Sequence, residues 1–144
     1  MGYTRVWLHL VWAVKRRKPL LIKDVREKVF IHIRENARDK DIHVDFVNGY
    51  VDHIHILLSL NADQTIAKVI QLIKGESSYW VNKNNLTSEK FEWQDDYFAV
   101  SVSESGVNKV REYIKNQEKH HQKKTFQQEY DEFMEKYGFV LMKS

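Results

Sequence analysis

The sequence predicts an α+β fold, in which helices pack on one antiparallel sheet. Two observations lead to this class. Four short stretches alternate apolar and polar side chains, and longer stretches between them repeat apolar residues every three or four positions. With 144 residues, of which 42% are hydrophobic and 30% charged, the chain has the length and composition of one globular domain. We therefore expect a single domain over residues 1–144.

The first predicted elements are a strand and a helix. The stretch "RVWLHLVWAV" (residues 5–14) alternates strictly, with one apolar face and a second face that includes Trp7 and His9. The stretch "IKDVREKVFIHIRENA" (residues 22–37) carries apolar side chains at helical spacing. We interpret His9 as a structural residue.

A hairpin and a second helix follow. The stretches "DIHVDFVNGY" (residues 41–50) and "DHIHILLSL" (residues 52–60) both have strand character. Asn48 and Gly49 lie between their centres and form a strong turn signal, although the turn itself can lie a few positions later. The stretch "DQTIAKVIQLIKGESSYWVNK" (residues 63–83) has one continuous apolar face and predicts a helix.

The last part of the chain adds one strand and two helices. "YFAVSVS" (residues 97–103) alternates, a helical pattern begins at Ser105, and Thr125 with Gln128 forms a capping box that opens a final helix. The order βαββαβ is that of the ferredoxin-like fold, with two helices on one face of the sheet. The other face, which carries Trp and His residues, requires cover from a second subunit, extra helices or a nucleic acid.

Charge and composition restrict the classes of protein. The net charge is +3, and the chain has no cysteine, which excludes disulfides and thiolate metal sites and favours a cytoplasmic location. No apolar run approaches the roughly 20 residues of a membrane helix.

Four basic side chains come together just before the single proline: Lys15, Arg16, Arg17 and Lys18. Such a cluster is either a solvated turn or a contact for nucleic-acid phosphates.

Two histidines stand one residue apart on the third predicted strand. His53 and His55 project from the same face, where two imidazoles can converge on a metal ion or a phosphate. The alternative interpretation is that both histidines are polar residues on a half-exposed strand. Asp52 adjoins the pair and can orient an imidazole. The helix after residue 105 places Tyr113 and Gln117 one turn apart, which offers a nucleophilic phenol and an oxygen ligand.

The sequence resembles the single-tyrosine HUH transposases of small insertion sequences, a superfamily that includes REP-associated tyrosine transposases. HUH denotes two histidines around a hydrophobic residue. Four segments carry the resemblance: "HLVWAVKRRKPLL", "GYVDHIHILLSL", "IAKVIQLIKGESS" and "VREYIKNQEKHHQ". The family often has a proline where this chain has Val51. The resemblance implies that His53, His55 and Gln117 bind Mg²⁺ or Mn²⁺ and that Tyr113 is the catalytic nucleophile.

The resemblance also implies a reaction and partners. We expect cleavage and rejoining of single-stranded DNA, through a 5′-phosphotyrosine intermediate, at element ends that contain hairpins. A homodimer is expected, in which active sites can be shared between the subunits. The candidate DNA-backbone contacts are Lys15, Arg16, Arg17, Lys18 and Lys74.

Three other interpretations fit parts of the same sequence. A domesticated relative would keep the fold and site but process repeated chromosomal hairpins. A non-catalytic RNA-binding module would need paired aromatic residues where this chain has His53 and His55. A metal-dependent hydrolase would activate water and would have no use for Tyr113.

Overall fold

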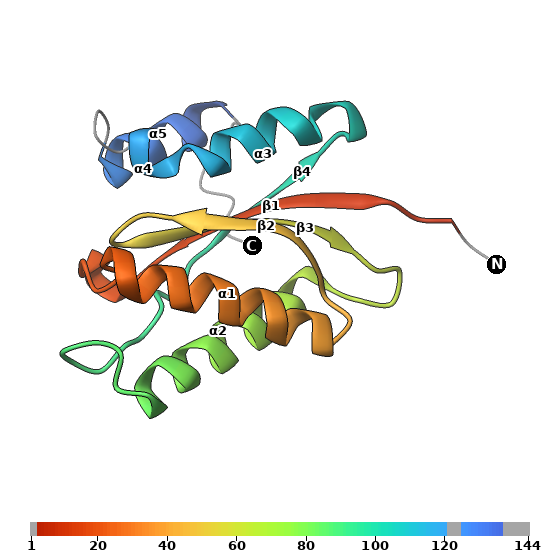
Figure 1. The fold of residues 1–144 in the computed structure, drawn as a ribbon. Coiled ribbons are helices and arrows are strands. Elements are labelled where there is room, and N and C mark those ends of the chain that lie inside the picture. Colours follow the sequence, from red (N-terminus) through yellow and green to blue (C-terminus); the bar gives the residue numbers. More distant parts are fainter. Residues whose placement is uncertain (1–2, 121–124, 137–144) are drawn as a thin grey trace.

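The computed structural model describes residues 3–120 and 125–136, and it has a sheet between two layers of helices (Figure 1). The sheet is antiparallel with the order β2-β3-β1-β4, and its strands are β1 (Val6–Ala13), β2 (His43–Gly49), β3 (His53–Leu60) and β4 (Phe98–Val102). The helices are α1 (Lys23–Asp39), α2 (Ile66–Lys83), α3 (Val107–Lys115), α4 (Gln117–His120) and α5 (Phe126–Lys136). Two short 3₁₀ helices are η1 (Lys15–Arg17) and η2 (Glu104–Gly106). The α+β class and the ferredoxin-like order are confirmed.

The main core lies between the sheet and helices α1 and α2. The alternation in β1 and β3 holds, since Leu10 and Trp12 face this core together with Ile54 and Ile56. All four are at most 1% exposed. Full burial of one such aliphatic side chain is worth about 1.5–3 kcal/mol, so the two central strands are strongly fixed in register.

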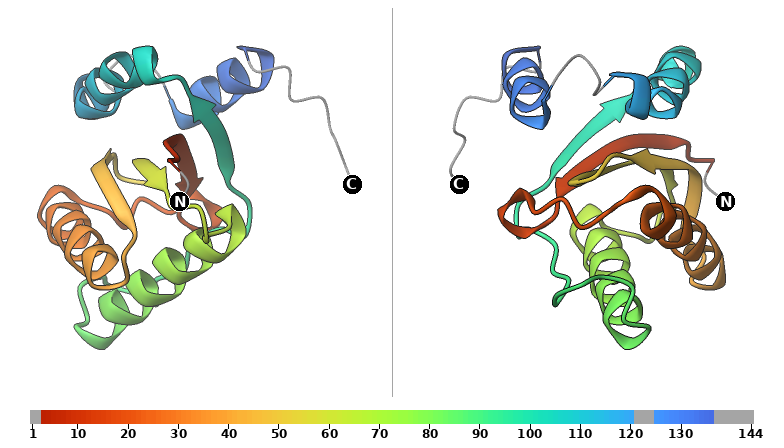
Figure 2. Two further views of the ribbon diagram at one scale, coloured as in Figure 1. Left: turned by 90° about the vertical axis from the view of Figure 1, so that its right-hand side faces the viewer. Right: turned by 60° about the vertical axis from the view of Figure 1, so that its left-hand side comes forward.

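The second face of the sheet is covered by the chain's own helices α3, α4 and α5 (Figure 2). Leu57 of β3 packs against Val107 and Ile114 of α3. Phe126 of α5 packs against Val11 and Ala13 of β1. A second subunit, extra helices or a nucleic acid was expected to cover this face, and the structure shows that extra helices cover it. Within the two described ranges of the chain, no helix is long and apolar enough to cross a membrane.

The hairpin between β2 and β3 turns at residues 50–52, a few positions after the Asn-Gly pair. Gly49 is the last residue of β2 and pairs with Ile54. A Cβ atom on Gly49 would lie 2.2 Å from the backbone oxygen of His53, so glycine is required here by close approach of the two strands. Gly49, one of the two residues that indicated a turn, thus allows β2 to pack closely against the start of β3.

Asn48 has a different role, which is to end α3. Its side-chain amide donates to the backbone oxygens of Ile114 at 3.0 Å and Lys115 at 3.1 Å. These carbonyls belong to the last turn of α3, where no further backbone donors continue the helix. Asn48 therefore connects β2 to the point where α3 stops and α4 begins.

Candidate active site

The two motif histidines lie on the helix-covered face of β3, an inner strand of the sheet. His53 and His55 are each 0% exposed, which excludes the interpretation that they are polar residues on a half-exposed strand. Asp52 Oδ1 lies 2.8 Å from His53 Nδ1, and His9 Nε2 lies 2.9 Å from His55 Nδ1. Both imidazoles are thus held through Nδ1, and both present Nε2 toward the helices above the sheet.

Tyr113 and Gln117 come from two successive helices. The sequence predicted one continuous helix, but Asn116 leaves helical geometry at φ −95° and ψ 19°, and α4 begins at Gln117. Asn48 explains the break, since it binds the carbonyls that a continuing helix would use. The one-turn spacing survives, because Gln117 Nε2 donates to the backbone oxygen of Tyr113 at 3.3 Å. Gln117 Oε1 lies 3.2 Å from His53 Nε2.

The Tyr113 ring packs edge-on against two histidine rings, with centroids 5.7 Å from His55 and 6.2 Å from His9. Burial raises the pKa of its phenol well above the ordinary value, and the nearby Glu129 carboxylate raises it further. Tyr113, His53, His55 and Gln117 are therefore brought together, with the phenol protonated at neutral pH.

Alkaline pH provides a test of the buried phenol. Because the folded chain holds the Tyr113 proton more tightly than the unfolded chain, this contribution to stability is present below the ordinary pKa of 10.0 and is lost as pH rises beyond it. Tyr113→Phe has no such proton. We expect its free energy of unfolding, measured by urea denaturation of metal-free protein, to fall less steeply than wild type above pH 10. Parallel curves would contradict a buried, proton-holding phenol.

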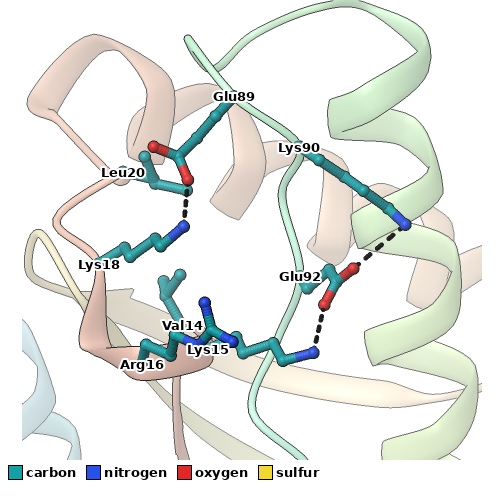
Figure 3. A pocket seen from close by; sticks show the side chains of 8 residues that line it. All are labelled: Val14, Lys15, Arg16, Lys18, Leu20, Glu89, Lys90 and Glu92. Carbon is teal, nitrogen blue, oxygen red and sulfur yellow. Dashed lines mark hydrogen bonds and ion pairs between the residues drawn. The ribbon is translucent and has the colours of Figure 1, made fainter.

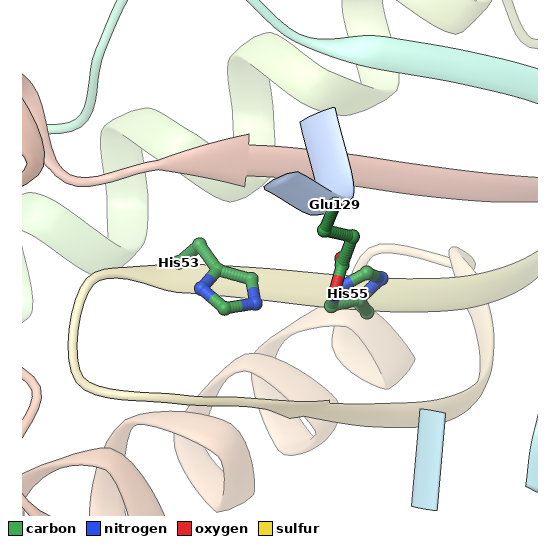
Figure 4. A group of neighbouring side chains, drawn as sticks. All are labelled: His53, His55 and Glu129. Carbon is green, nitrogen blue, oxygen red and sulfur yellow. The ribbon is translucent and has the colours of Figure 1, made fainter. Parts of the chain in front are cut away.

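Two site residues were missed from the sequence, His9 and Glu129. His9 is 3% exposed and its Nε2 lies 2.9 Å from His55 Nδ1, whereas only a structural role was predicted for it. Glu129 of α5 is 1% exposed, and its Oε1 lies 2.7 Å from His55 Nε2. Figure 4 shows this carboxylate reaching from α5 to His55 of β3, with His53 on the same strand. No local pattern marks Glu129, since its position depends on how α5 packs on the sheet.

The group fits a divalent cation. One donor atom each from His53, His55 and Glu129 lie within 4.8 Å of one another. Donors bound to one ion at about 2.1 Å are at most roughly 4.2 Å apart, so small side-chain rotations close the difference. Two imidazole nitrogens with carboxylate and amide oxygens form a donor set that suits a divalent metal.

Comparison with known proteins identifies the family of this chain. Residues 3–117 match the family model for the IS200-like transposases. The chain belongs to this family. This confirms the resemblance seen in the sequence, and it makes the chain a DNA-processing enzyme of transposition. The matched region contains all four predicted metal-binding and catalytic residues, and Gln117 is its last residue.

Named relatives and solved structures agree with the family. The ISDra2 transposase TnpA of Deinococcus radiodurans is 29% identical over 76% of this transposase and 81% of its own length. The transposase for insertion sequence element IS200 of Salmonella typhimurium is 25% identical over 76% of this chain and 74% of its own.

Two solved structures share the fold. One, from Deinococcus radiodurans R1 and described as a transposase, has a TM-score of 0.64 over 81% of this chain and 95% of that chain, at 23% identity. The other is a REP-associated tyrosine transposase bound to a REP hairpin, with a TM-score of 0.62 over 84% of this chain and 72% of that chain, at 16% identity.

The first three residues of the basic cluster form η1, one residue after the end of β1. Lys15, Arg16 and Lys18 line a hollow together with acidic residues (Figure 3). Lys15 pairs with Glu92 at 2.8 Å, and Lys18 pairs with Glu89. These are exposed pairs, which contribute little and exchange easily for other anions. The backbone nitrogen of Val14 donates to the backbone oxygen of Asp52 at 2.8 Å, so the cluster begins beside His53.

Lys74 has a different environment from the other candidate contacts. Its ammonium donates to the backbone oxygens of Gln94, Asp95 and Asp96 at 2.7, 3.0 and 3.3 Å. Burial lowers its pKa, although Asp95 and Asp96 oppose this. All three donors of the ammonium are thus used to hold the segment that leads into β4.

Proposed function

We propose that this transposase cleaves and rejoins single-stranded DNA through a covalent bond between Tyr113 and a 5′-phosphate. The observation that supports this most strongly is the convergence of the Tyr113 phenol with Gln117 and the two buried histidines. A surface tyrosine would have no such neighbours. The family membership adds the class of reaction, and the geometry adds the residues.

The reaction exchanges one phosphoester for another. The Tyr113 oxygen attacks the phosphorus, the bond from phosphorus to the 3′ oxygen breaks, and the 3′ oxygen leaves as a hydroxyl. The phenol loses one proton and the leaving oxygen gains one, so the step is balanced without added water. A phenol, with an ordinary pKa near 10, is a better leaving group than a sugar alkoxide. A later 3′-hydroxyl can therefore attack the phosphotyrosine and rejoin the strand.

We propose that the site binds a divalent cation, Mg²⁺ or Mn²⁺. Its ligands would be His53 Nε2, His55 Nε2 and Gln117 Oε1. When bound, such an ion supplies Lewis-acid polarisation of the scissile phosphate. Asp52 and His9 keep the two imidazoles in the required orientation through their hydrogen bonds to Nδ1.

The DNA partner is proposed from position and charge. Lys15, Arg16 and Lys18 follow the end of β1, whose last residue, Ala13, pairs with His53. We propose that a DNA strand that enters the site passes these side chains. The solved REP-associated relative was bound to a hairpin. By this likeness we propose hairpin-containing element ends as substrates and a homodimer as the working form, with light scattering as the measurement of the dimer.

The test is to find the covalent bond and locate it. Full-length protein is incubated with labelled single-stranded oligonucleotides that carry hairpins from the DNA flanking its gene, with Mn²⁺, and run on a denaturing gel. We expect a DNA-linked protein band. Trypsin digestion should place the nucleotide on the peptide of residues 112–115, which contains Tyr113. Cleaved DNA with no linked protein would instead indicate hydrolysis by water.

A further inference from the structure

Helix α5 lies directly on the two histidines, although it is outside the region matched by the family model, which ends at residue 117. Its first residue, Phe126, stacks on the His53 ring with centroids 4.5 Å apart and planes at 28°. The Arg17 guanidinium lies over Phe126 at 5.1 Å and over Tyr130 at 5.8 Å. Phe98 of β4 packs edge-on against Tyr130 at 5.0 Å. Contacts to β3, η1 and β4 therefore fix the position of α5.

This docking buries one carboxylate in the site. Glu129 lies one turn after Phe126 and is 1% exposed, with Oε1 2.7 Å from His55 Nε2. Removing a carboxylate from water is costly unless a cation or several hydrogen bonds replace the water. The other proposed ligands of the ion are the imidazoles of His53 and His55 and the amide of Gln117, and none of them carries a negative charge. Glu129 supplies the anion that a buried dication would otherwise lack.

We propose that Glu129 is a further ligand of the divalent cation, supplied by a helix outside the family's matched region. The donor set is then His53 Nε2, His55 Nε2, Gln117 Oε1 and a Glu129 carboxylate oxygen. This inference rests on the proposed metal site and extends it. Asp52, the acid that precedes His53 in the sequence, lies 2.8 Å from His53 Nδ1 and supports that ring from the opposite side.

The donor geometry supports a ligand role for Glu129. Nδ1 of each imidazole is held, by Asp52 and by His9, so Nε2 is the ring nitrogen that faces the helices above the sheet. Both Nε2 atoms face oxygen donors, one from α4 and one from α5. Two nitrogens and two oxygens that point to a common region form the coordination pattern of a divalent ion.

The test measures Mn²⁺ affinity by electron paramagnetic resonance on the full-length, metal-stripped protein, without DNA. We expect Glu129→Gln to weaken Mn²⁺ binding by about 10–100-fold, the range seen when the surroundings of a metal ligand are changed. Glu135→Gln is the matched control, since it makes the same change at an exposed position of α5 and should leave affinity unchanged. Glu129→Asp keeps the charge but withdraws the oxygens, and we expect weaker binding here also.

The outcomes separate this inference from the proposed function. Wild-type or tighter Mn²⁺ binding in both Glu129→Gln and Glu129→Asp, with binding lost in His53→Ala, would overturn the Glu129 assignment alone. The carboxylate would then be a partner of His55 that competes with the ion. No Mn²⁺ binding by wild type, or unchanged binding in His53→Ala, would overturn the metal site and this inference together. Thermal melts of each variant establish that it is folded.

Discussion

Tyr113→Phe is expected to abolish the covalent protein–DNA product and to reduce cleavage by roughly four orders of magnitude or more, as for removal of other catalytic nucleophiles. The substitution removes one oxygen. The ring remains, so the edge-on packing against His55 and His9 is kept. DNA binding in a gel-shift assay should therefore be close to wild type. Single-turnover cleavage on a denaturing gel gives the rate.

The matched control is Tyr79→Phe. Tyr79 is 63% exposed on α2, on the opposite side of the sheet from the site, and should tolerate the change with full activity. Cleavage that survives Tyr113→Phe at the wild-type rate would mean that water is the nucleophile. The metal-dependent hydrolase interpretation would then replace the transesterification that we propose.

Gly49→Ala is expected to lower the free energy of unfolding by about 2–4 kcal/mol. The added Cβ would lie 2.2 Å from the backbone oxygen of His53 and 3.0 Å from the Ile54 Cα. Both are backbone atoms, so no flexible side chain can move aside, and the two strands must separate. Because His53 begins β3, we also expect weaker Mn²⁺ binding. Urea denaturation measures the loss of stability.

Gly75→Ala provides a control of opposite sign. Gly75 lies within α2 and is exposed, and an added Cβ meets no atom within 4 Å. Alanine in a helix is favoured over glycine by up to about 1 kcal/mol, so this variant should be more stable than wild type. Equal effects of the two substitutions would show that the close approach at Gly49 does not constrain the hairpin.

Much of the fold could be predicted because its signals are local. Period-two and helical patterns indicated each strand and the main helices, and Thr125 with Gln128 forms the expected capping box through bonds of 2.9 and 3.2 Å. The turn after Gly49 and the break at Asn116 were not predicted in detail. Both depend on contacts between strands or between Asn48 and α3, which no sequence window contains.

The candidate site was predictable where spacing alone brings residues together. His53 and His55 share a strand face, and Tyr113 and Gln117 are one turn apart, so their proximity within each element follows from geometry. His9 requires the register of β1 with β3, in which it lies opposite Leu57 and diagonal to His55. Glu129 requires the docking of a separate helix. Long-range packing, rather than local pattern, supplies these two residues.

The alternation of β1 and β3 has a consequence for variation in this chain. On β1, Leu10 and Trp12 face the core, while His9 faces the site; on β3, Ile54 faces the core between His53 and His55. Neighbouring residues thus belong to opposite sides of one sheet. Substitutions on one side can adjust folding while those on the other adjust chemistry, so the two properties can evolve, or be engineered, largely independently. An insertion or deletion of one residue within either strand would exchange the two sides and destroy both.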